Sequence, residues 1–178
     1  MRASASPTTP ALPMGLRFAI DVPLFSYAPF ISGGSGSETG FRLSGGALEL
    51  GYAPSPVVTI GASLGVDYRS AGDESAVAAS FVGFVDVAPG ESATRFFIRP
   101  HFGGTTSPTL GGWLFGVRLG ARVLAIGHVT VEPWAELRYS RASTDVMTLG
   151  PRGEVEVVSL GVGVASIALG LSVALWGE

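Results

Sequence analysis

The sequence predicts an all-β fold: a single antiparallel up-and-down β-barrel of eight strands that spans a membrane. Large apolar residues alternate with small or polar ones along many short segments, and a period of two is the signature of a β-strand. Hydrophobic residues make up 47% of the 178 residues and charged residues only 14%, which is too apolar for a typical soluble surface. The apolar character is spread over all the segments, as expected of strands that each turn one face to lipid.

Residues Met1 to Met14 predict a disordered leader, followed by one barrel domain over residues 15–178. The leader is rich in Pro, Ser, Thr and Ala and contains no apolar run that could form the core of a signal peptide. A barrel needs export, so we infer that a targeting segment has been removed from this chain or lies upstream of an alternative start. The alternative is a soluble protein without such a segment.

The first four strands are predicted at about Gly15 to Tyr27, Phe41 to Tyr52, Val58 to Arg69 and Ala76 to Val87. A bulge is expected at Gly45-Gly46, where the phase of the second segment changes. The third segment alternates most clearly, with polar and very small residues sharing one face. The fourth carries Ala, Val or Phe on both faces, so its alternation does not fix which face is which.

The next three strands keep their charges on one face. The fifth follows a turn at Pro89-Gly90, and a turn at Gly127-His128 joins the sixth to the seventh. The opposite, apolar faces carry Phe96, Ile98, Pro100 and Phe102 in the fifth strand, Trp113, Phe115, Val117, Leu119, Ala121 and Val123 in the sixth, and Val129, Val131, Ala135, Leu137 and Tyr139 in the seventh.

The last segment, Glu154 to Trp176, has no charge after Glu156 and is long enough to be a membrane-spanning helix. Its large residues nevertheless stand on alternate positions, which indicates a strand. The phase slips at Ala165-Ser166 and again near Val157, so we predict one strand with bulges, two shorter strands joined by a turn being the alternative. The large residues taken as outward are Leu160, Val162, Val164, Ile167, Leu169, Leu171, Val173 and Leu175.

The connections predict the orientation. Those near Pro54, Pro89 and Gly127 are tight, whereas those near Gly34, Gly72, Ser107 and Gly150 are mostly longer, and in bacterial barrels the short turns are periplasmic. A loop centred near Gly150 would place His128 opposite Leu171 and Ser172. Outward aromatics gather near the strand ends, as interfacial girdles require, whereas Trp134 and Trp176 fall on the inward phase. The girdle residues are Tyr52, Phe96, Tyr68, Phe102, Trp113 and Tyr139.

The charged face is predicted to line the lumen. An eight-stranded barrel is only wide enough for its own side chains, so charges inside must pair and hydrogen-bond. We therefore expect a lumen charge network with a structural role rather than an open pore. Its predicted members are Arg17, Asp21, Glu49, Asp67, Arg69, Arg99, His101, Arg118, Arg122, Glu132, Glu136 and Arg138.

These features together resemble the small eight-stranded outer-membrane β-barrel proteins of Gram-negative bacteria, the OmpA/OmpX-like class. The resemblance covers about Gly15 to Trp176 and rests on architecture, without a diagnostic motif. It implies location in the bacterial outer membrane, contact with outer-membrane lipid, and insertion by the barrel-assembly machinery. A closing strand of that class ends on an aromatic residue that helps this machinery recognise it; here Trp176 is followed by Gly177 and Glu178.

Three functions remain to be weighed. A structural or surface-interaction barrel, expected to be a monomer, is favoured, because only the lipid face and the lumen are well developed. A lipid-modifying enzyme would use His101 with an inward Ser or Glu136. A soluble lipocalin-like binding barrel would put the charged face outward. Neither His has metal-ligand spacing, the chain has no Cys, and a net charge of -3 gives no reason to expect nucleic acid, so no cofactor or metal is predicted.

Overall fold

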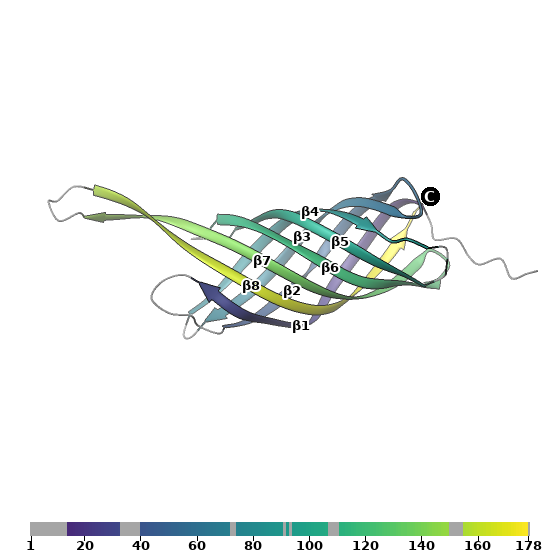
Figure 1. Cartoon of the computed structure of the whole chain (residues 1–178), viewed down its shortest axis with the longest axis horizontal. Helices are drawn as coiled ribbons and strands as arrows, with labels where there is room; N and C mark the ends of the chain where they lie inside the picture. The colour runs from purple at the N-terminus through teal and green to yellow at the C-terminus, as the bar shows by residue number, and fades with distance from the viewer. Residues whose placement is uncertain are drawn as a thin grey trace, which may run out of the picture.

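The computed structural model describes residues 14–32, 40–71, 74–90, 92, 94–106, 111–149 and 155–177. These residues form a closed barrel of eight strands in chain order (Figure 1). Every strand pairs antiparallel with the next, and β1 pairs with β8 to close the barrel. The predicted fold class is confirmed. The strands are β1 (Gly15–Ser32), β2 (Gly40–Ala53), β3 (Val58–Ala71), β4 (Glu74–Val87), β5 (Thr94–Thr106), β6 (Gly111–Ile126), β7 (Val129–Leu149) and β8 (Val155–Trp176).

The two faces of the barrel wall differ as the alternation requires. Large hydrophobic side chains cover the outside, with Phe96 77% and Leu64 62% exposed. Most charged side chains that the structure describes point inward, and Arg17 and Glu132 are fully buried. So large an apolar exterior is unfavourable in contact with water but favourable in contact with lipid. The soluble alternative with its charged face outward is therefore wrong. No helix among the described residues is long and apolar enough to cross a membrane.

The irregularities of the wall lie partly where the sequence predicts them. The pairing of β2 with β3 shifts between Ser44 and Gly46, and Gly46 has a φ of 101°, which favours glycine. The predicted slips in β8 are wrong, because its pairing with β7 runs unbroken from Leu149↔Val155 to Val129↔Leu175.

The register shifts next to β8 belong to its other neighbour. They lie in β1, between Pro23 and Phe25 and between Tyr27 and Phe30. Pro23 cannot donate a ladder hydrogen bond, which explains a bulge there. Because β8 keeps its phase, Val164 is buried at 6% exposure instead of facing outward. Leu160 and Val162 have side chains outside the described part of the chain.

The connections differ from their predicted lengths. β3 ends at Ala71 and β4 begins at Glu74, so the expected loop from Ser70 to Ser75 is mostly strand. The longest strands are β7 and β8, with 21 and 22 residues, and they extend as a hairpin beyond the rest of the barrel at the left of Figure 1. His128 lies beside the end of β8, where its carbonyl accepts a hydrogen bond from Trp176 N. It does not lie opposite Leu171, because the β7–β8 connection begins after Leu149 and is centred later than Gly150.

The two ends of the barrel carry different connections, and we call them the turn end and the loop end. The turn end carries the β2–β3, β4–β5 and β6–β7 connections and the C-terminus (Figure 1). The loop end carries the other four connections. The predicted leader, residues 1–14, lies outside the described residues except for Met14.

Candidate functional site in the barrel lumen

The inward phase gathers charged side chains from seven of the eight strands. β1 supplies Arg17 and Asp21, β2 Glu49, β3 Asp67, β4 Asp86, β5 Arg99, β6 Arg118 and Arg122, and β7 Glu132, Glu136 and Arg138. No single pair explains this arrangement, because most members contact two or three partners of opposite charge. We call these eleven residues the lumen network.

The layer nearest the turn end is built around two arginines. Arg17 donates to Glu49 at 2.5 Å and to Glu132 at 2.8 Å. Arg122 donates to Glu132 at 2.8 Å and to Asp86 at 2.7 Å. Each carboxylate is thus shared between cations that come from different strands. Sharing offsets the desolvation cost that an enclosed charge with one partner would leave uncompensated.

The next layer has the same construction. Arg99 donates to Glu49 at 2.6 Å and to Asp86 at 2.8 Å. Arg118 donates to Asp21 at 2.6 Å and to the same Glu49 at 3.1 Å. Glu49 therefore receives hydrogen bonds from three arginines, because Arg17 binds its other oxygen. Glu132 is connected to a similar extent, since Arg17, Arg122 and Thr130 donate to it and Arg99 lies 3.7 Å from it.

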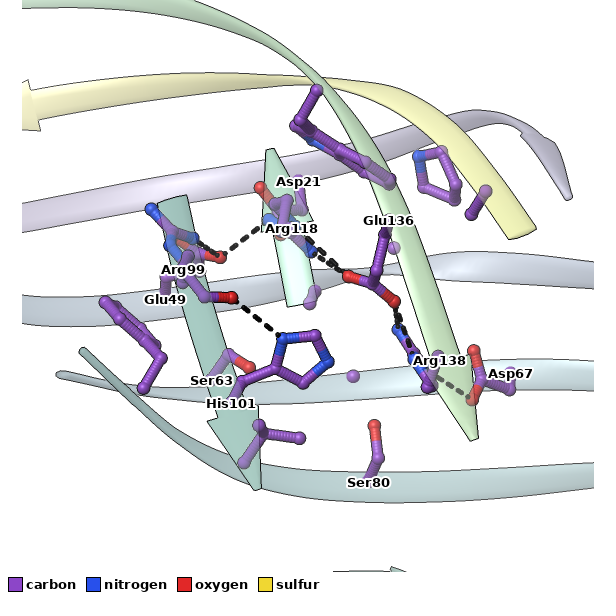
Figure 2. A pocket seen from close by; sticks show the side chains of 18 residues that line it. Asp21, Glu49, Ser63, Asp67, Ser80, Arg99, His101, Arg118, Glu136 and Arg138 are labelled. Carbon is purple, nitrogen blue, oxygen red and sulfur yellow. Dashed lines mark hydrogen bonds and ion pairs between the residues drawn. The ribbon is translucent and has the colours of Figure 1, made fainter. Parts of the chain in front are cut away.

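The network thins toward the loop end. Glu136 accepts from Arg118 at 3.0 Å and from Arg138 at 2.6 Å, and Arg138 continues to Asp67 at 3.3 Å. Ser172 donates to Asp21. Figure 2 shows this chain, with Arg118 between Asp21 and Glu136 and Arg138 between Glu136 and Asp67.

Aromatic rings fill the space between the arginines. The guanidinium of Arg118 lies 4.1 Å from the ring centroid of Trp134, and that of Arg99 lies 4.4 Å from Phe84. Both distances suit cation–π attraction. Trp176 lies inside the lumen as well, 4.9 Å from Arg122, and its Nε1 donates to Thr130 Oγ1 at 3.0 Å.

Glycines make room for these rings. A Cβ on Gly170 would overlap the Trp134 ring, and one on Gly120 would come within 2.5 Å of Phe97. A methyl group in either place would have to displace an aromatic side chain in a packed lumen. The many inward glycines of the sequence are therefore explained in part by close approach of inward aromatics.

A cavity of about 40 Å³ lies beside the network, on its loop side (Figure 2). Its lining includes His101, Ser63, Ser80, Glu136 and Arg138. A space of this size holds a few water molecules at most. His101 Nδ1 lies 3.5 Å from the carbonyl of Arg99, and His101 Nε2 has no hydrogen-bond partner in the part of the chain that the structure describes.

The cavity does not have the geometry of a Ser–His hydrolase. Neither Ser63, Ser80 nor Glu136 forms a hydrogen bond with His101 among the described residues. The imidazole also points away from the lipid that such an enzyme would modify. The described residues contain no group of three or more His, Cys, Asp or Glu side chains that could hold a metal ion.

Beyond this cavity the lumen changes character. Among the side chains that the structure describes, its loop-side half holds small and hydroxyl-bearing ones with a single large aliphatic one, Leu114, which is fully buried. The buried residues of this half are Ser26, Ala28, Ala78, Ser80, Thr105, Leu114, Ser140, Ala142 and Val164. On β1, β4, β5, β6 and β7, each stands nearer the loop end than the network members of the same strand do, and β8, which carries Val164, has no network member.

Most predicted members of the site lie in the lumen, and two differences matter. The side chain of Arg69 lies outside the described residues. Asp86 is missing from the predicted set although it binds both Arg99 and Arg122. Because large and small residues alternate only weakly in β4, the sequence did not show on which face Asp86 lies. One signal could have revealed it: Asp86 is the one charged residue between Ala76 and Val87, and a lone charge in an apolar strand belongs on the polar face.

Comparison with known proteins gives a likeness of fold alone. No family model matches the chain, and no curated protein matches its sequence. Among solved structures, Neisserial surface protein A (NspA) matches with a TM-score of 0.59 and 13% sequence identity, over 92% of this chain and 97% of that one. The chain has the fold of the small eight-stranded outer-membrane β-barrels.

A second barrel of this kind, the outer membrane protein OprG from Pseudomonas aeruginosa, matches over 93% of this chain and 98% of its own. Its TM-score is 0.49 and its identity 12%. At 13% identity a shared fold does not imply a shared function. The function must therefore be argued from the residues of this chain.

Proposed function

We propose that the protein is a bacterial outer-membrane barrel with a structural or surface-interaction role, and that its lumen is closed to ions. The observation that carries the proposal is the contrast between an apolar exterior and a lumen filled by shared ion pairs. Five arginines and six carboxylates occupy the space in which a pore would hold water. Contact with outer-membrane lipid, a monomeric state and insertion by the barrel-assembly machinery belong to this proposal.

The β7–β8 hairpin supports the surface role. β6 pairs with β7 as far as Gly111↔Ser143, and β1 pairs with β8 as far as Ser32↔Gly163. β7 and β8 continue together to Leu149↔Val155. A ribbon that extends beyond the barrel offers backbone edges to a partner outside the membrane.

Conductance tests the closed lumen. We expect the purified protein in planar lipid bilayers to show no large, stable single-channel conductance. The double variant Arg17→Ala/Glu132→Ala removes two large side chains from the layer nearest the turn end and serves as the matched control, with more frequent current events expected. Stable conductance of the unaltered protein would overturn the proposal.

Protease access tests the location and orientation. Arg152 lies between β7 and β8, so trypsin added to intact cells should cut there and leave the barrel whole. An Arg152→Gln variant should resist this cut. Cleavage only after the outer membrane is permeabilised would place the loop end on the periplasmic side and contradict the orientation.

A further inference from the structure

An apolar groove of about 350 Å³ runs along the outer wall over β6, β7 and β8. Its floor is Ala165, and its walls include Phe115, Leu137, Tyr139 and Ile167. The register explains the hollow: Phe115 pairs with Tyr139, which pairs with Ala165, so a methyl group stands in a row of aromatic rings. The groove lies on the face that the proposed function assigns to lipid.

Aromatic side chains surround one end of this groove. The rings of Trp113, Phe115 and Tyr139 lie with their centroids 5.7 to 5.9 Å apart. Beyond Trp113 and Tyr139, toward the loop end, the next outward positions are small or polar, including Gly111 and Ser143. The groove therefore ends at the loop-side border of the apolar belt, where lipid headgroups begin.

A positively charged side chain, that of Arg141, lies at this border. Arg141 pairs with Trp113 across β6 and β7, is exposed, and lies with its guanidinium over Gly161 of β8. Every other arginine whose side chain the structure describes donates to a carboxylate or a backbone carbonyl, whereas Arg141 has no such partner among the described residues. An exposed guanidinium beside an apolar groove complements a molecule with an anionic head and an apolar tail.

We propose that this surface is a binding site for an anionic, phosphate-bearing membrane lipid, with one acyl chain in the groove and the phosphate against Arg141. Planar guanidinium groups bind phosphate through paired hydrogen bonds, and the neighbouring Tyr139 and Trp113 rings suit the interface between headgroup and chain. The proposal rests on the membrane location proposed above, and it adds a preferred lipid and a place for it.

Tryptophan fluorescence provides the test, because Trp113 is exposed on the outer face while Trp134 and Trp176 are buried in the lumen. The protein is placed in phosphatidylcholine vesicles that contain a small fixed fraction of brominated lipid, whose bromine quenches tryptophan on contact. We expect brominated phosphatidylglycerol to be about fivefold enriched at Trp113 over brominated phosphatidylcholine with the same chains. The enrichment should fall as salt is raised.

Two sets of variants distinguish binding of the lipid headgroup from binding of its acyl chain. Arg141→Gln should abolish the preference for phosphatidylglycerol, and Arg141→Lys should retain part of it. Ala165→Phe should fill the groove and reduce quenching by both lipids, whereas Ala79→Phe, at an outward alanine on β4, should leave quenching unchanged.

Equal quenching of the unaltered protein by the two lipids, or a preference that survives Arg141→Gln, overturns the lipid site and leaves the barrel in the membrane. Absence of quenching by either lipid contradicts the membrane location itself. Folding of each variant is checked by its resistance to detergent unfolding, and the Lys variant provides the comparison if the Gln variant does not fold.

Discussion

The two halves of the lumen are both buried but are filled by different means. The turn-side half holds the lumen network, in which cations and carboxylates share hydrogen bonds with aromatic rings between them. The described side chains of the loop-side half are Ala, Ser, Thr and Val around Leu114. The exterior is apolar around both halves, so the lipid face does not distinguish them.

The difference shows where the free energy of a filled barrel comes from. A small apolar side chain in the loop-side half contributes its own burial and little else. A charge in the turn-side half contributes only while its partners remain, since enclosed charges without partners are strongly unfavourable. We therefore expect large, coupled losses of stability from changes in the network and moderate, independent losses from changes on the loop side.

The largest loss is expected from Glu49→Ala. This change leaves Arg17, Arg99 and Arg118 each without one acceptor in an enclosed space. We expect the free energy of unfolding to fall by about 3–5 kcal/mol, measured by urea titration in detergent or vesicles. Glu49→Gln keeps the shape but not the charge and should lose nearly as much. A loss below that of a single apolar truncation would remove the distinction between the halves.

A moderate loss is expected from Leu114→Ala on the loop side. Leu114 is the largest fully buried aliphatic side chain, and its truncation opens a cavity among small neighbours. The same urea titration should show a loss of about 2–3 kcal/mol, and Leu114→Met should cost less than about 1.5 kcal/mol. Combined with Glu49→Ala, the two losses should add, because the sites share no partner.

Coupling within the network should be visible at its loop-side edge. Glu136→Ala leaves Arg138 with Asp67 alone among the partners described above, so we expect the double variant Glu136→Ala/Arg138→Ala to be more stable than the two single losses together imply. A double-mutant cycle should give a coupling of about 1–3 kcal/mol. Strictly additive losses would mean that this pair contributes no more than two independent side chains.

The smallest difference is between two buried serines. Ser172 donates to the Asp21 carboxylate, whereas Ser140 Oγ has no hydrogen-bond partner within the described residues. Ser172→Ala should cost about 1.5–3 kcal/mol, and Ser140→Ala should be close to neutral. Equal costs in the urea titration would show that the hydroxyl groups of the two halves are held in the same way.

The alternation of the sequence was sufficient for the fold, because a period of two fixes both the strand and its two faces. It put Arg118 and Arg122 on the inward face of one strand and Glu132 and Glu136 on that of the next, without indicating which would pair. In the structure Arg118 pairs with Glu136 and Arg122 with Glu132. The alternation failed in β4, because large apolar residues occupy both faces: Val82 and Phe84 point inward, and Phe81 and Val85 point outward. An inward aromatic such as Phe84 needs a facing glycine, here Gly61, which the single strand does not reveal.

The register of strand pairing could not be predicted from the sequence, for a different reason. The interruption assigned to β8 at Ala165 belongs to β1, because a bulge changes the phase of the strand that contains the extra residue and is read only when two strands are paired. The partners of Glu49 come from β1, β5 and β6, so no pattern within one segment could have indicated them.

Labelling of single cysteines along β8 tests the central claim, that lipid meets one face of the wall and the filled lumen the other. The chain contains no Cys, so replacements from Ile167 to Leu175 can be introduced one at a time. A lipid-soluble reagent should label Ile167, Leu169, Val173 and Leu175, and neither this nor a water-soluble reagent should label Ala168, Gly170, Ser172 or Ala174. A labelling period near 3.6, or protection of the Leu and Val positions from the lipid-soluble reagent, would contradict the account.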